Sequence, residues 1–202
     1  MRASLTVAVF LAITASLVAQ PLQEPQARYG MKARLKQYPQ ETPKETLKSA
    51  LAAINSQDFS YLVAHLLDPK FVDEAVRERT QELLPTAERD LVRLREYQRA
   101  NRDRIDPADR LPFEPQEFRQ RVDQKAQELG FQQLVQHVAR QLGDDLQTVR
   151  AFRRILYDGT FAVTDTSATA THPDFKNRAI FFTKVGNRWF IENRQVEAKK
   201  EP

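Results

Sequence analysis

The sequence predicts an α+β fold in which helices come first and a small antiparallel sheet comes last. Apolar residues recur with helical spacing from Leu47 to Leu156. Residues 160 to 195 are instead rich in threonine, valine, isoleucine and aromatic residues, with two-residue alternation. We therefore expect N-terminal helices and a long helical hairpin packed on a curved C-terminal antiparallel sheet of about four strands.

Composition excludes several classes of site. The chain has 202 residues, no cysteine and five glycines, the closest two being 13 positions apart. Without cysteine there is no disulfide framework, thiol nucleophile or cysteine-based metal centre, and the glycine spacing excludes the glycine-rich phosphate loops. The net charge of +4 is weakly basic, and residues 73–104 mix eight arginines with eight acidic residues. This mixing is typical of a solvated helical surface, so we expect no nucleic-acid partner.

The N-terminal residues have the pattern of a secretory signal peptide. Arg2 precedes an uncharged stretch over residues 3–23, whose centre is densely apolar. We predict a signal peptide over residues 1–19 and a periplasmic or extracellular location, with membrane contact only during export. The alternative is an uncleaved anchor, but that requires about 20 strongly apolar residues, and serine and threonine dilute this run.

Three further segments complete the predicted organisation. Residues 20–41 contain three prolines and no periodic apolar pattern, which indicates a flexible linker. Residues 42–196 form a single predicted α+β domain with a helical insertion over about residues 70–142. Residues 197–202 are predicted to be a disordered tail.

Start and stop signals divide the helical region into separate helices. Thr42-Pro43-Lys44-Glu45 has the sequence of a capping box at the start of the first helix. A short helix from Asp58 stops at Asp68-Pro69, and a third helix follows it. After the second helix of the hairpin, Gly130 is predicted to be a helix end, and Gly143 with Asp144 a stop before the last helix.

The predicted hairpin rests on a narrow seam. Between residues 83 and 105, apolar or uncharged positions recur at alternating spacings of three and four, and a helix with its own apolar positions follows the turn over residues 106–115. Two antiparallel helices packed along this seam explain the pattern. A structural role for the hairpin is the simpler interpretation, and a partner-binding coiled coil is the alternative.

Residues 179–194 predict a β-hairpin turning at Gly186-Asn187, with Val185 paired to Arg188. One face then carries the predicted core residues Ile180, Phe182, Trp189 and Ile191. The other face carries the predicted pocket or interface residues Phe181, Val185 and Phe190. Exposing these three apolar side chains to water is unfavourable. We therefore expect this face to be covered, either by another part of the chain or by a second copy in a homodimer.

Two segments carry a family resemblance. They are Gln57-Asp58-Phe59, after the first helix, and the closing hairpin Lys184-Val185-Gly186-Asn187-Arg188-Trp189-Phe190-Ile191. The chain thereby resembles the nuclear transport factor 2-like superfamily, a cystatin-like α+β cone, in an exported bacterial type with an extended helical region. The resemblance implies a pocket between the first helix and the sheet. It implies no particular reaction, because members include isomerases, dehydratases and polyketide cyclases as well as binding domains.

Few residues are candidates for catalysis. Tyr157, Asp158 and Asp165 lie near the start of the sheet, where a carboxylate could act as a general base beside a tyrosine donor; a turn and a strand end explain the same residues. The three histidines, His65, His137 and His172, are predicted to lie at the surface, with no metal-binding spacing. Asp103, Asp106 and Asp109 alternate with arginines and predict an ordinary turn. We expect no metal and no cofactor.

These observations favour an exported, non-enzymatic binding or interaction domain whose partner is an unknown small ligand or envelope protein. The alternative is a pocket enzyme of the isomerase, dehydratase or hydrolase type that uses an aspartate near the sheet.

Overall fold

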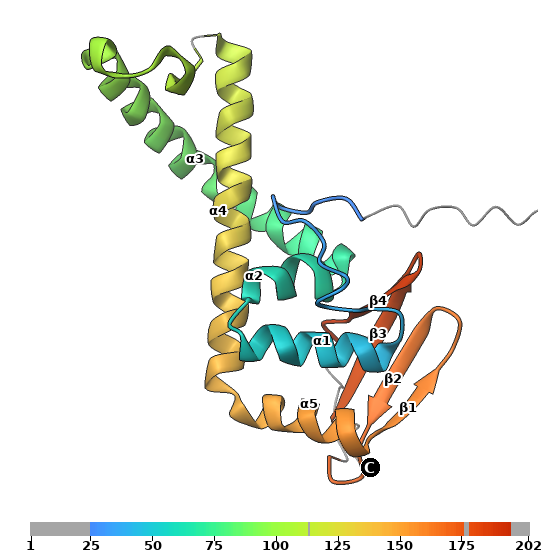
Figure 1. The fold of residues 1–202 in the computed structure, drawn as a ribbon. Helices are drawn as coiled ribbons and strands as arrows, with labels where there is room; N and C mark the ends of the chain where they lie inside the picture. The colour runs from blue at the N-terminus through green and yellow to red at the C-terminus, as the bar shows by residue number, and fades with distance from the viewer. Residues whose placement is uncertain (1–24, 113, 176–177, 195–202) are drawn as a thin grey trace, which may run out of the picture.

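The computed structural model describes residues 25–112, 114–175 and 178–194, and it has the α+β architecture that the sequence predicts (Figure 1). The predicted signal peptide, residues 1–19, and the predicted tail, residues 197–202, lie outside the described residues. The helices are α1 (Pro43–Asn55), α2 (Phe59–Tyr61), the π-helix η1 (Leu62–Leu66), α3 (Pro69–Ala100), the 3-10 helices η2 (Arg102–Arg104) and η3 (Pro107–Asp109), α4 (Pro115–Asp144) and α5 (Leu146–Asp158). The strands are β1 (Thr160–Val163), β2 (Ser167–Thr171), β3 (Ala179–Val185) and β4 (Arg188–Ile191).

Local sequence signals set the helix ends. At the start of α1, Glu45 N donates to Thr42 Oγ1 at 3.2 Å, while Thr42 N donates to the Glu45 carboxylate at 3.1 Å. This is the capping box that the sequence predicts. At the start of α5, Thr148 N donates to the Asp145 carboxylate at 2.9 Å, so Asp145 caps α5. Helix α4 ends at Asp144, directly after Gly143, and α5 begins at Leu146, which confirms the predicted stop.

The four strands form one antiparallel sheet in the order β1-β2-β3-β4. Val185 pairs with Arg188 and Phe182 with Ile191, which confirms the hairpin register predicted from Gly186-Asn187. Gly186 has a φ of +60°, a conformation that favours glycine in a two-residue turn.

Helices α1 and α5 lie on one face of the sheet and form the main core with it (Figure 1). Leu47 and Ala50 of α1 meet Phe182 and Trp189 of the sheet in one cluster, and each of these residues is at most 4% exposed. Side chains therefore fill the space between the first helix and the sheet, where the family resemblance implies a pocket.

The flexible linker is predicted over residues 20–41, of which residues 20–24 lie outside the described residues. Residues 25–41, which we call the strap, pack against the body and are not a free linker. Tyr38 and Gln40 are each only 2% exposed. Tyr29 stacks on Phe131 of α4 with ring centroids 4.6 Å apart, and its hydroxyl donates to the Asp73 carboxylate at 2.6 Å. Burial, together with Asp73, raises the pKa of Tyr29 to about 12. Isolated aromatic and polar side chains thus hold the strap, and they leave no periodic pattern.

Helices α3 and α4 form the predicted hairpin and cross close to Gly130. A Cβ at Gly130 would lie 3.1 Å from both the backbone N and Oγ1 of Thr80. The glycine permits this close approach, and α4 continues through it to Asp144. The prediction that Gly130 ends a helix is therefore wrong.

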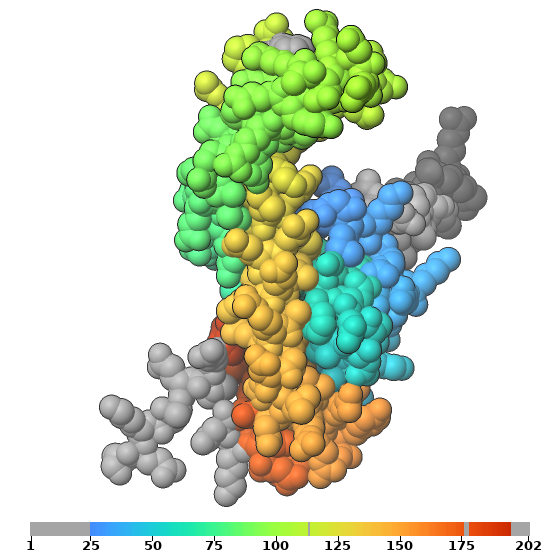
Figure 2. Space-filling model, turned by 90° about the vertical axis from the view of Figure 1, so that its left-hand side faces the viewer, coloured from blue at the N-terminus to red at the C-terminus, as the bar shows by residue number. Residues whose placement is uncertain are grey.

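Beyond this crossing, residues 84–112 and 114–129 project from the body, and we call these residues the arm (Figure 2). The arm has a small core of its own, in which Ala87 and Leu91 of α3 meet Val122 and Ala126 of α4. Within the described ranges, none of the helices, however long, is apolar enough to span a membrane.

Candidate functional site

The tip of the arm contains an open hollow of about 290 Å³. It lies where α3 ends and the connection to α4 begins, at the upper left of Figure 1. Its lining is basic and contains no carboxylate: Arg95, Gln98, Arg99, Arg102, Arg110 and Leu111.

Helical spacing and the connection bring these side chains together. Arg95, Gln98 and Arg99 lie on successive turns of one side of α3. Arg102 follows in η2, and Arg110 returns to the same place just after η3. The positions that line the hollow thus span only 17 residues, from 95 to 111.

Two side chains hold the connection in place. Gln98 Nε2 donates to Asp109 O at 3.0 Å, while Leu111 N donates to Gln98 Oε1 at 2.8 Å. The Arg110 guanidinium donates to the carbonyl oxygens of Arg102, at 2.7 Å, and Ile105, at 2.8 Å. These bonds join both ends of the connection, so the shape of the hollow is fixed by the protein itself.

Three of the four arginines that line the hollow are not neutralised by carboxylates of the described residues. Across the described parts of the chain, Arg95, Arg102 and Arg110 make no ion pair with a carboxylate. Arg95 Cζ instead lies 4.1 Å from the centroid of the Phe118 ring of α4. A guanidinium held over an aromatic face keeps its charge and most of its N–H donors. The hollow therefore presents several cationic donors to solvent.

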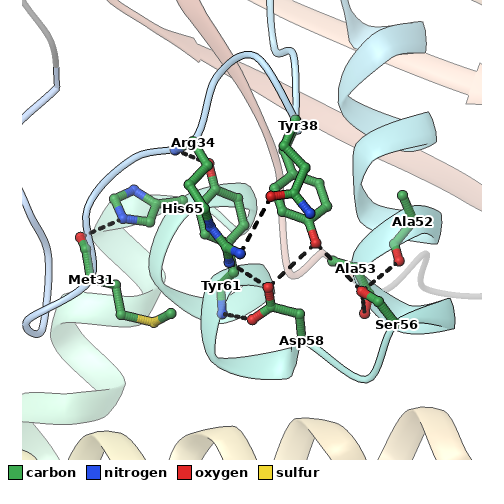
Figure 3. A network of polar contacts seen from close by, with 10 residues as sticks. Met31, Arg34, Tyr38, Ala52, Ala53, Ser56, Asp58, Tyr61 and His65 are labelled. Carbon is green, nitrogen blue, oxygen red and sulfur yellow. Dashed lines mark hydrogen bonds and ion pairs between the residues drawn. The ribbon is translucent and has the colours of Figure 1, made fainter.

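A second polar cluster joins the strap to the body (Figure 3). Asp58 accepts hydrogen bonds from the Arg34 guanidinium and from the Tyr38 hydroxyl, and Tyr61 Oη accepts one from Arg34 N at 2.9 Å. Arg34 Cζ lies 4.4 Å from the Tyr61 ring centroid. Burial raises the pKa of Tyr61. Tyr61 and His65 are both fully buried, so this cluster fastens the strap to the body.

The catalytic candidates are not brought together. Tyr157 is 77% exposed at the end of α5, and Asp158 forms an exposed ion pair with Arg154 at 3.3 Å. Asp165 is exposed in the turn between β1 and β2, at the opposite end of β1 from the other two. None of these three side chains lines the hollow at the tip of the arm.

The two faces of the hairpin differ in burial. The core candidates Ile180, Phe182, Trp189 and Ile191 are all buried. Of the three candidates for a pocket or an interface, Val185 is 51% exposed, Phe181 is half-buried and Phe190 is buried. Guanidinium groups lie over the two aromatic rings, Arg188 over Phe190 and Arg194 over Phe181, each 4.9 Å from the centroid. The chain's own arginines therefore contribute to covering this face.

Two of the three histidines depart from the expectation that they lie at the surface. His65 is completely buried and His172 is 8% exposed, whereas His137 is exposed. In the described ranges no group of three or more histidine, aspartate and glutamate side chains is arranged to hold a metal ion. Asp106, from the acidic run in the connection, accepts a hydrogen bond from Ala108 N at 2.9 Å and so caps η3.

The arginines of the hollow were not among the residues selected from the sequence. A signal for them exists: positions 95, 99 and 102 follow the i, i+4, i+7 spacing of one helical face. The equal number of acidic residues in the same stretch concealed it, because a charge count does not show which side chains share a face.

No family model, curated protein or solved structure matches the chain. The resemblance to the nuclear transport factor 2-like superfamily therefore stays a prediction from the sequence motifs.

Proposed function

We propose that this chain is an exported binding domain, rather than an enzyme, and that its ligand site is the hollow at the tip of the arm. The observation that carries the proposal is the hollow itself: about 290 Å³, lined by four arginines and no carboxylate, and shaped by hydrogen bonds from Gln98 and Arg110. This volume is at the lower end of those of small-ligand pockets.

The division between body and arm supports a binding role. The body has a filled core between α1 and the sheet, and the strap is fastened to it by buried polar contacts. The arm carries the hollow away from this core (Figure 2). The connection that forms the site is already held by its own hydrogen bonds, so less order has to be gained when a ligand binds.

The enzymatic alternative lacks an assembled site. An isomerase, dehydratase or hydrolase would need its aspartate within hydrogen-bonding reach of a bound substrate. Asp158 is exposed and paired with Arg154, and Asp165 lies in a separate turn. Neither residue lines the hollow.

Ligand-observed NMR with a mixed set of small anions, cations, sugars and amphiphiles tests the proposed function. We expect the full mature chain to bind at least one compound, and Gln98→Ala to lose this binding because it releases Asp109 O and Leu111 N. Gln116→Ala is the matched control, since Gln116 is exposed and does not line the hollow. If no compound binds, or if Gln98→Ala binds like the control, the proposal is wrong.

Export is tested separately by expressing residues 1–202 in a bacterium and measuring the mass of the product. The uncharged apolar stretch after Arg2 supports removal of residues 1–19. We expect a product that begins at Gln20 and is released with the periplasmic fraction. An intact N-terminus in the cytoplasm would contradict export.

A further inference from the structure

We propose, on the basis of the proposed function above, that the ligand of the hollow is a small phosphate compound with at least two negative charges. The guanidinium groups of Arg95, Arg99, Arg102 and Arg110 would hold it.

The first argument is charge. Four guanidinium groups line one hollow of about 290 Å³, and arginine stays protonated at any physiological pH. Like charges held together repel one another, and an anion bound among them relieves this repulsion. Arg95, Arg102 and Arg110 have no carboxylate partner in the described parts of the chain, so their charges are open to an anionic ligand.

The second argument is preorganisation. Arg110 is fixed by its bonds to Arg102 O and Ile105 O, and Arg95 is fixed over the Phe118 ring. A side chain that is already ordered loses less entropy when it binds. Arg102 differs from them, because its guanidinium makes no hydrogen bond or ion pair with the described residues and keeps its donors for a ligand.

The third argument is the match between donors and acceptors. A guanidinium fork pairs with two oxygens of a carboxylate or phosphate. One carboxylate offers a single charge and two oxygens, enough for one fork. A phosphate monoester or a pyrophosphate offers two or more charges and at least three terminal oxygens, so it can serve several forks at once. Gln98 uses its amide within the protein and adds no further recognition group.

The surroundings favour a small ligand over a polyanionic chain. Asp103, Asp106 and Asp109 are exposed in the same connection but do not line the hollow. A nucleic-acid backbone crossing the tip would meet these carboxylates, whereas a ligand confined to the hollow avoids them. The volume also suits a compound of small size.

Isothermal titration of the full mature chain at low salt tests this assignment with four probes: inorganic phosphate, inorganic pyrophosphate, glycerol 3-phosphate and succinate. We expect a phosphate compound to bind, and more tightly than succinate. Tighter pyrophosphate points to an inorganic anion, and tighter glycerol 3-phosphate points to an organic ester; both results support the proposal. No binding of any phosphate probe at about 10 mM, a concentration that would detect even a weak site, would overturn it, as would succinate binding equally well.

Arg102→Gln and Arg104→Gln form the matched pair of variants. Both residues lie in η2 and both changes remove one positive charge, but only Arg102 lines the hollow. We expect Arg102→Gln to weaken binding on the order of tenfold or more, the effect of losing a charged hydrogen-bonding partner, with an unchanged unfolding temperature. Equal weakening in Arg104→Gln would mean a diffuse charge effect and would overturn the site.

The two proposals fail differently. If the NMR mixture identifies a neutral or cationic ligand that Gln98→Ala abolishes, the phosphate assignment is wrong and the binding role stands. If nothing binds at the tip, both are wrong.

Discussion

His65 Nε2 donates a hydrogen bond to the carbonyl oxygen of Met31 at 2.9 Å, and this bond ties the strap to η1 (Figure 3). The other ring nitrogen, Nδ1, is buried without a hydrogen-bond partner. Burial lowers the pKa of His65, and the guanidinium groups of Arg188, Arg28 and Arg34 lower it further, against the opposing effect of the Met31 bond. The folded protein therefore holds this histidine neutral.

This depressed pKa predicts a loss of stability in mild acid. The unfolded chain takes up a proton at His65 below its ordinary pKa of about 6.5, while the folded chain resists it. The contribution of His65 to the free energy of unfolding is complete above pH 6.5 and is lost as the pH falls toward the pKa of His65 in the folded chain. The free energy of unfolding then changes by up to about 1.4 kcal/mol per pH unit. Urea unfolding at pH 7 and pH 5.5 measures it.

His65→Gln, whose amide can still donate to Met31 O, should show a smaller difference between the two pH values than the wild-type chain. His137→Gln is the control, because His137 is exposed, and it should behave like the wild type. Equal pH dependence in all three proteins would show that His65 does not contribute.

Replacing Gly130 by alanine should destabilise the crossing of α3 and α4. Alanine is favoured over glycine in a helix by about 1 kcal/mol. At Gly130, however, its Cβ would lie 3.1 Å from Thr80 N and 3.2 Å from Val76 O, which are backbone atoms that cannot rotate away. We expect Gly130→Ala to lower the free energy of unfolding by about 1 kcal/mol net, as measured by urea titration.

Gly143→Ala is the matched control in the same helix. A Cβ there meets nothing within 4 Å, so the helix preference acts alone and we expect a gain of up to about 0.5 to 1 kcal/mol. If Gly130→Ala raised the free energy of unfolding, α3 and α4 would be able to move apart at this point without destabilising the protein, and the prediction would be wrong.

The hydrogen bonds of Gln40 fasten the strap to the body, so replacing Gln40 tests how much the strap contributes to stability. Its Nε2 donates to the carbonyl oxygens of Trp189, at 2.7 Å, and His65, at 2.9 Å, and its Oε1 accepts from the Arg188 guanidinium at 2.6 Å. Gln40→Ala removes these bonds and takes the amide acceptor away from the Arg188 guanidinium, although Trp189 O keeps a bond from Thr46 Oγ1 at 3.3 Å and His65 O keeps one from Arg188 at 3.2 Å. We therefore expect a loss of about 2 kcal/mol in unfolding free energy. Gln37→Ala, at an exposed strap position, should change stability by less than about 0.5 kcal/mol. Similar values for the two would contradict a fastened strap.

Where the sequence predicts the fold well, a local signal specifies a single geometry. The capping box at Thr42 and the Gly186-Asn187 turn are such signals, and the helix start and hairpin register follow from them. Gly130 shows the limit, because a glycine within a helical pattern indicates either a helix end or a close helix crossing. Only the neighbouring Thr80, 50 positions away in the chain, distinguishes the two.

The strap and the hollow depend on contacts that periodicity does not encode. Gln40 reaches Trp189 across 149 positions, and nothing near Gln40 in the sequence indicates this partner. The hollow requires α3 to end at Ala100 and the connection to return Arg110 to the same face. Helical spacing could group Arg95, Arg99 and Arg102, but the return of Arg110 follows from the tertiary bonds of the connection.

A homodimer is one of the two explanations for the apolar outer face of the sheet, the other being coverage by the chain itself, and it predicts a concentration-dependent association. Val185 is suited to this test because it is 51% exposed, so a charge there should not disturb folding. Phe190 is buried, and its replacement would destabilise the fold. Sedimentation of the mature chain should show dimers that Val185→Asp dissociates, with Val163→Asp, on the other face, as an exposed control. A monomer at high concentration would contradict the dimer.

The central claim is that the arginine-lined hollow is the binding site of the domain. NMR spectra of the isotope-labelled mature chain, recorded during titration with pyrophosphate, test it most directly because they locate the ligand on the chain. We predict saturable shifts in the amide signals of residues 95–111, while those of residues 180–191 in the sheet stay unchanged. Shifts centred on the sheet, or none that saturate at the tip, would contradict the claim.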